Sequence, residues 1–140
     1  MSRPRYLVDS NVLLRFLTGE PPALIRAART LIEGAERGEC TLQVSALVVA
    51  ETAFTLESFY GHARKEVARV LGEFLKTPGI RPGERDRVLD ALDHVQAKGI
   101  HFVDAYLAAV ARASSIPTAS PGRSGCVAPC GRSNRLEAGR

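Results

Sequence analysis

Short strand-like runs alternate with amphipathic helical segments along most of this chain, and this alternation limits its fold more than any other feature. Residues 6–8, 40–45, 80–82 and 116–120 are predicted to be strands. Between them, apolar residues recur at helical spacing in the segments 10–20, 23–38, 46–61, 63–79, 84–99 and 102–115. Strands that alternate with helices are typical of an α/β domain built on a parallel sheet. The sequence therefore predicts that fold class.

The composition of the chain changes near its C-terminus. The 140 residues, of which 45% are hydrophobic, suffice for one domain with a sizeable core. From Pro117 onward, however, 14 of 24 residues are Pro, Gly, Ser or Arg. Such a segment buries little apolar surface. We therefore expect a folded domain over residues 1–120 and an irregular tail over 121–140.

The net charge of +4 is a weak indication of a nucleic-acid partner. Residues 117–140 contain four arginines and one glutamate, which leaves a net charge of only +1 on the first 116 residues. No apolar run reaches the roughly 18 residues that a membrane span needs. The N-terminal "MSRPRYLVDS" also lacks the apolar stretch of a secretion signal. These features predict a cytoplasmic protein with no membrane partner.

Three acidic residues lie among apolar neighbours. Asp9 follows the first predicted strand in "YLVDSNVLL", Glu51 lies within the apolar helix "ALVVAETAF", and Asp104 lies near the start of "HFVDAYLAAVA". An ionised carboxylate close to a core is costly unless it has a partner. Asp9 and Asp104 have a simpler explanation as helix N-caps, since Asp is favoured there. Glu51 has no such explanation in mid-helix, although an exposed position on its helix would also account for it.

The three carboxylates together favour a common role. Asp9 is predicted at the carboxyl end of a parallel strand, which is where open α/β sheets bind ligands. Converging carboxylates repel one another, and a divalent cation such as Mg²⁺ or Mn²⁺ offsets that repulsion because it prefers oxygen ligands. A cation held in this way activates water and neutralises charge on a phosphate. The pattern therefore indicates metal-dependent hydrolysis of a phosphodiester.

The same residues resemble those of PIN domains, and most of all the ribonuclease toxins of VapBC-type toxin–antitoxin pairs. The similar segments are "LVDSNVLLRFL", "VSALVVAETAFTL" and "FVDAYLAAVA", in matching order and spacing over about residues 5–120. The resemblance implies a three-layer α/β/α sandwich with a central parallel sheet. It also implies Mg²⁺- or Mn²⁺-dependent cleavage of RNA, a homodimer, and an antitoxin protein that blocks the cleft.

The resemblance assigns roles to five residues. Asp9, Glu51 and Asp104 match the catalytic, metal-binding acids of the family. Asn11 and Ser45 match supporting polar groups that position a carboxylate or a water molecule. Two of these positions have alternative roles, because Asn11 is also suited to a hydrogen bond at a helix start and Ser45 to an N-cap.

The chain departs from the family at its C-terminus. Family members have a fourth acidic position after the last strand, in a segment like T-x-D-x-D-F. Here "PTAS" is followed by "PGRSGCVAPCGRSNRLEAGR", which contains no Asp and a single, distant Glu137. We hypothesise a shifted reading frame or an altered end after about Ser120, which the coding DNA would test. Loss of one carboxylate predicts weaker metal binding and reduced or absent nuclease activity.

Other functions fit the sequence less well or differ in class. A haloacid-dehalogenase-like phosphatase needs a second Asp two residues after the first, where this chain has Asn11. A catalytically inactive PIN-like module would instead bind an antitoxin-like protein, with the helices at 46–59 and 62–76 lining a groove. The basic tail alone could attract RNA. Cys126 and Cys130 form a C-x3-C pair without the further ligands of a zinc site.

Overall fold

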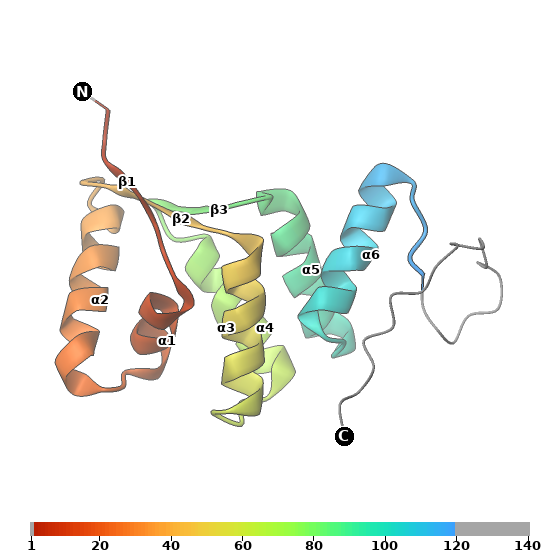
Figure 1. Ribbon diagram of the computed structural model, residues 1–140, viewed down its shortest axis with the longest axis horizontal. Coiled ribbons are helices and arrows are strands. Elements are labelled where there is room, and N and C mark those ends of the chain that lie inside the picture. Colours follow the sequence, from red (N-terminus) through yellow and green to blue (C-terminus); the bar gives the residue numbers. More distant parts are fainter. Residues whose placement is uncertain (1, 120–140) are drawn as a thin grey trace, which may run out of the picture.

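The computed structural model describes residues 2–119 and places in them a three-stranded parallel sheet and six helices (Figure 1). The elements in chain order are β1 (Arg5–Leu7), α1 (Ser10–Thr18), α2 (Pro22–Glu36), β2 (Thr41–Val44), α3 (Ala46–Ser58), α4 (Arg64–Leu75), β3 (Ile80–Pro82), α5 (Arg85–Lys98) and α6 (Phe102–Ser114). The predicted α/β class with a parallel sheet is confirmed.

The strands lie side by side in the order β1-β2-β3, so both crossover connections advance in the same direction across the sheet. Tyr6 pairs with Leu42 in the β1–β2 register, and Leu42 pairs with Ile80 in the β2–β3 register. Right-handed crossovers that advance in one direction place their helices on one face of a sheet. In Figure 1 the helices accordingly extend to one side of the strands.

The core lies between this face of the sheet and the helices. Leu42 and Val44 alternate with half-buried Thr41 and Gln43 along β2, as expected for a strand with one buried face. The helices complete the core with side chains that are almost inaccessible to solvent. These include Leu13, Ile32, Val49, Leu71, Leu75 and Val88.

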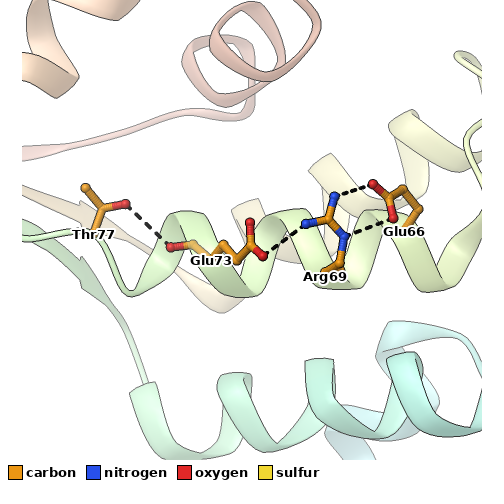
Figure 2. Close-up of polar contacts among 4 residues, drawn as sticks. All are labelled: Glu66, Arg69, Glu73 and Thr77. Atoms are coloured by element: carbon orange, nitrogen blue, oxygen red, sulfur yellow. Dashed lines mark hydrogen bonds and ion pairs between the residues drawn. The ribbon is translucent and has the colours of Figure 1, made fainter.

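The outer surface of α4 shows how several acidic residues of this chain pair with arginine (Figure 2). The Arg69 guanidinium lies between Glu66 and Glu73, and it donates to the Glu73 carboxylate over 3.0 Å. The hydrogen bond from Arg69 holds the pKa of Glu66 below the usual value for a glutamate. Thr77 in turn donates to the Glu73 carbonyl over 3.5 Å. These carboxylates are surface partners of arginine.

The C-terminal expectations have a mixed outcome. The strand predicted at 116–120 is wrong for its described part, because residues 116–119 are irregular and pair with no strand. The tail predicted at 121–140, with its two cysteines, lies outside the described residues. Over residues 2–119, no helix combines the length and apolar character needed to cross a membrane.

Candidate functional site

Two of the candidate residues lie where strands of the sheet give way to helices. Asp9 follows β1 and caps α1, since its Oδ1 accepts a hydrogen bond of 3.1 Å from the Val12 N–H. Ser45 follows β2 and caps α3 through a 3.2 Å hydrogen bond from the Val48 N–H to its Oγ. The capping roles considered for both residues are therefore confirmed. Asp9 is exposed rather than buried, so its position requires no compensating cation.

Asn11 is the second residue of α1 and is exposed to solvent. It lies two positions beyond Asp9 at the carboxyl end of β1. This location is compatible with the supporting polar role that the family resemblance implies, which stays a prediction.

Glu51 lies in the middle of α3, on a face of that helix which no other element of the described residues covers. Leu47, four residues earlier, is 83% exposed, and Phe54, three residues later, is 67% exposed. Residues at this spacing share one helix face. Most residues of α3 are buried or half-buried, and Val49 and Ala53 belong to the core, whereas Glu51 lies on the exposed face. Glu51 is an exposed carboxylate between two exposed apolar side chains.

Asp104 lies in the first turn of α6 and is exposed. The alternative that it caps this helix is wrong, because the helix begins earlier and His101 occupies the N-cap position. Contacts with α5 hold α6 in place: the Tyr106 hydroxyl donates to Glu84 over 2.6 Å, and Arg112 donates to Asp90 over 2.6 Å. The Tyr106 hydroxyl is also the main cause of the lowered pKa of the Glu84 carboxyl.

The three candidate acids come from separate elements that pack near one another, since α3 contacts both α1 and α6. Their side chains do not form a ligand group as the structure places them. Within residues 2–119, no three His, Cys, Asp or Glu side chains are grouped closely enough to hold a metal. The oxygen donors of the three carboxylates therefore suit Mg²⁺ or Mn²⁺, whereas their placement in the structure does not fit either ion.

Asp9, Glu51 and Asp104 also differ from the acids of α4. None of the three forms a salt bridge with another residue in the described part of the chain. Their charges are thus not neutralised by arginine or lysine there. These carboxylates are available to a cationic ligand.

Sequence reasoning did not identify Arg64, the first residue of α4. It contacts Glu57 near the end of α3, Gly99 directly after α5 and His101 directly before α6. Its guanidinium donates to the Gly99 carbonyl over 2.7 Å, lies 3.0 Å from His101 Nε2, and forms a 3.3 Å salt bridge with Glu57. The partners are as many as 37 positions away in sequence. No local pattern could have indicated such a contact.

A small cavity of about 140 Å³ lies between α1, α3 and α4. Leu17, Leu56, Val67 and Val70 line it, together with His62 and Glu66. It opens beside the two helices that the sequence proposes as a partner groove. The cavity is separate from the three candidate acids, none of which lines it.

Comparison with known proteins identifies the family. The PIN domain family matches residues 6–123, which is most of the chain. No curated protein and no solved structure matches it. PIN domains are generally nucleases, and the three-stranded parallel sheet with its helices agrees with a PIN-like fold. The chain belongs to the PIN domain family.

Proposed function

We propose that this protein is a cytoplasmic, Mg²⁺- or Mn²⁺-dependent endoribonuclease that hydrolyses RNA phosphodiester bonds. In this proposal Asp9, Glu51 and Asp104 are the acids that bind the metal, and Asn11 and Ser45 support them. The protein is the toxin of a toxin–antitoxin pair, acts as a homodimer, and is inhibited by a cognate antitoxin protein.

The observation that carries this proposal is the membership of the PIN family together with three carboxylates at matching positions. Each lies on an element that packs against α3 or belongs to it, and each lacks a salt bridge within the described residues. Oxygen ligands of this kind suit a hard divalent cation, which supplies an activated water and neutralises phosphate charge. Because the three acids are not yet grouped as ligands, metal binding must include a movement that brings them together.

The C-terminal departure from the family limits the expected activity. The chain lacks the fourth acid, so less negative charge attracts the cation. We expect a lower metal affinity than in a complete relative and a correspondingly reduced rate of RNA cleavage.

The test combines Mn²⁺ titration calorimetry with RNA cleavage in the same buffer, on the wild-type chain and on Asp9→Asn. Asn is as good an N-cap as Asp, so this variant keeps the cap of α1 while it removes the charge. Asp93→Asn, an exposed acid on α5, is the matched control. Saturable Mn²⁺ binding and metal-dependent cleavage that are lost only in Asp9→Asn support the proposal. Cleavage that is equal in all three chains contradicts it.

The second candidate is a catalytically inactive PIN-like module that binds an antitoxin-like protein. Two observations favour it: the ungrouped acids, and the cavity between α1, α3 and α4 beside the proposed partner groove. This candidate predicts capture of the product of a neighbouring small open reading frame by the wild-type chain and by Asp9→Asn alike. It also predicts no RNA cleavage by either chain.

A further inference from the structure

The N-cap residue of α6 is joined to other helices by a polar contact of its side chain. His101 Nε2 lies 3.0 Å from the guanidinium of Arg64, the first residue of α4. The same guanidinium donates to the Gly99 carbonyl at the end of α5 over 2.7 Å, and it lies 3.3 Å from the Glu57 carboxylate of α3. The His101 side chain makes no capping hydrogen bond of its own. It therefore contributes to the position of α6 through Arg64 rather than through a cap.

The chemistry of this contact requires a neutral imidazole. A guanidinium stays protonated and has no acceptor atom, so Arg64 can only donate to His101 Nε2. Nε2 accepts a hydrogen bond only when it carries no proton, which places the ring proton on Nδ1. Once the ring is protonated, both of its nitrogens are donors, and the contact becomes a repulsion between two cations. Because histidine side chains ordinarily change charge between about pH 5 and 8, this contact can respond to pH within that range.

The charged groups near His101 act in opposite directions on a proton there. Arg64 of α4 opposes the proton, as do Lys98 in the last turn of α5 and the positive end of the α6 dipole. Glu57 of α3 favours it, because Glu57 and His101 line the same cavity of about 50 Å³ between α3 and α6. Asp104 lies three residues further along α6, and no salt bridge joins it to His101. Whichever acid offsets the charge, the hydrogen bond from Arg64 is lost.

Phe102 limits how far a change at His101 can spread. Phe102 is 6% exposed, and its ring is stacked on that of Tyr106 with a centroid distance of 6.2 Å. This packing does not involve the guanidinium, so it holds the body of α6 in place. Loss of the contact should therefore loosen only the first turn of α6, where the Ala105 N–H donates to the His101 carbonyl over 3.0 Å.

We propose that the contact between His101 and Arg64 is a pH-sensitive switch, which orders the first turn of α6 near neutral pH and releases it on acidification. The contacts of Arg64 with Gly99 and Glu57 persist, because neither depends on the imidazole. Asp104 lies in the turn that the switch controls, so a proposed metal-binding acid is also affected. That consequence rests on the proposed function, whereas the switch itself does not.

The test measures amide exchange by nuclear magnetic resonance at about pH 7.5 and about pH 5, on the full 140-residue chain without added metal. Each rate is divided by the intrinsic rate at the same pH, which gives a protection factor. Ala105 reports on the first turn of α6. Gly99, whose N–H donates to the Val95 carbonyl over 2.8 Å, is the internal reference at the end of α5. Circular dichroism checks that each chain folds at both pH values.

The variants assign the response to one imidazole, since the chain contains three histidines. His101→Gln keeps an acceptor oxygen for Arg64 but does not change charge in this pH range. His101→Ala removes the acceptor altogether. His62→Gln and His94→Gln are the matched controls, because they replace the other two histidines and leave the contact intact.

We expect acidification of the wild-type chain to lower the protection factor of Ala105 about fivefold, as the loss of one net hydrogen bond predicts, and to leave that of Gly99 constant. His101→Gln should keep the neutral-pH protection of Ala105 at both pH values, and His101→Ala should have the lower value at both. His62→Gln and His94→Gln should respond to pH as the wild type does.

Three results would overturn the proposal. The first is a wild-type protection factor of Ala105 that stays constant or rises on acidification; a rise would mean that Glu57 captures the protonated imidazole. The second is a pH dependence that persists in His101→Gln. The third is an equal loss of protection at Gly99, which would identify a general loosening of the fold.

Two features of the design keep the outcome decisive. If neither variant at His101 folds, the comparison of Ala105 with Gly99 in the wild type and in the two control variants still decides. No metal or RNA is present, so a failure of the proposed nuclease function changes none of these readouts and is detected separately.

Discussion

Gly79 should be one of the least replaceable residues in the fold, and Gly79→Ala tests this directly. Gly79 has φ +84°, a conformation that L side chains rarely adopt. A Cβ built on it would lie 2.2 Å from the Ala35 carbonyl oxygen and 2.6 Å from the Ala35 carbonyl carbon at the end of α2. These are backbone atoms, so no side-chain rotation relieves the overlap. The Gly79 carbonyl also accepts the Leu42 N–H over 2.9 Å, which ties it to the β2–β3 pairing.

The expected destabilisation has two parts. The left-handed conformation costs an alanine about 1–2 kcal/mol. Displacing the packed backbone of α2 adds about 1–3 kcal/mol, as over-packing of a core does. The sum of about 2–5 kcal/mol is a large fraction of the roughly 5–15 kcal/mol by which domains are stable. With an m-value of about 1–3 kcal/mol/M, a loss of about 3 kcal/mol lowers the urea midpoint by about 1–3 M.

Gly61→Ala is the matched control for the steric part. Gly61 has φ +70°, but its added Cβ would meet no atom within 4 Å. It should therefore lose only the conformational part, about 1–2 kcal/mol. Urea unfolding followed by far-ultraviolet circular dichroism measures both variants. If Gly79→Ala and Gly61→Ala have the same midpoint, the close approach of Gly79 to α2 is not a real constraint and the reasoning fails.

Two further predictions concern a helix cap and a surface carboxylate. Ser45→Ala should lower the free energy of unfolding by about 0.5–2 kcal/mol, while Ser45→Asn should preserve most of it, as thermal unfolding of both variants would determine. The Tyr106 hydroxyl and the Arg87 guanidinium lower the pKa of Glu84, so the stability that Glu84 contributes is present above the usual glutamate pKa and is lost as the pH falls through its lowered pKa. Urea unfolding should therefore separate Glu84→Gln from the wild type at pH 7, and the difference should shrink as the pH falls below the usual glutamate pKa; a difference that does not change with pH would contradict this linkage.

The strand, the helix end and the N-caps that could be located from the sequence are those that depend on a few successive residues. The bounds of β3, Ile80–Pro82, agree with the prediction, and the end of α1 at Gly19 follows from its left-handed conformation at the C-cap. The caps at Asp9 and Ser45 belong to the same class, because an N-cap depends on only three or four successive residues.

The errors arose where burial depends on what packs against an element. The apolar sequence of α3 could not show which of its apolar residues are exposed, and Leu47 and Phe54 are exposed because no described element covers them. The irregular residues 116–119 failed as a strand because a strand requires a pairing edge, which sequence periodicity cannot supply. Asp104 was considered as a cap because Asp is favoured at that position, but the helix begins at Phe102, as its apolar pattern predicts, and leaves Asp104 in the first turn.

The exposure of the candidate acids changes the physical argument for a metal. Sequence reasoning treated Asp9 as a buried charge that needs a cation, but an exposed Asp9 that caps α1 is stable without one. Desolvation therefore cannot be what holds a cation at this site. For the proposed metal, what is left is the attraction of the three carboxylates, which grows as they approach one another. If the proposed metal binds all three acids, the free energy of bringing them together is subtracted from the free energy of binding, so metal affinity should depend on how the elements that carry them pack.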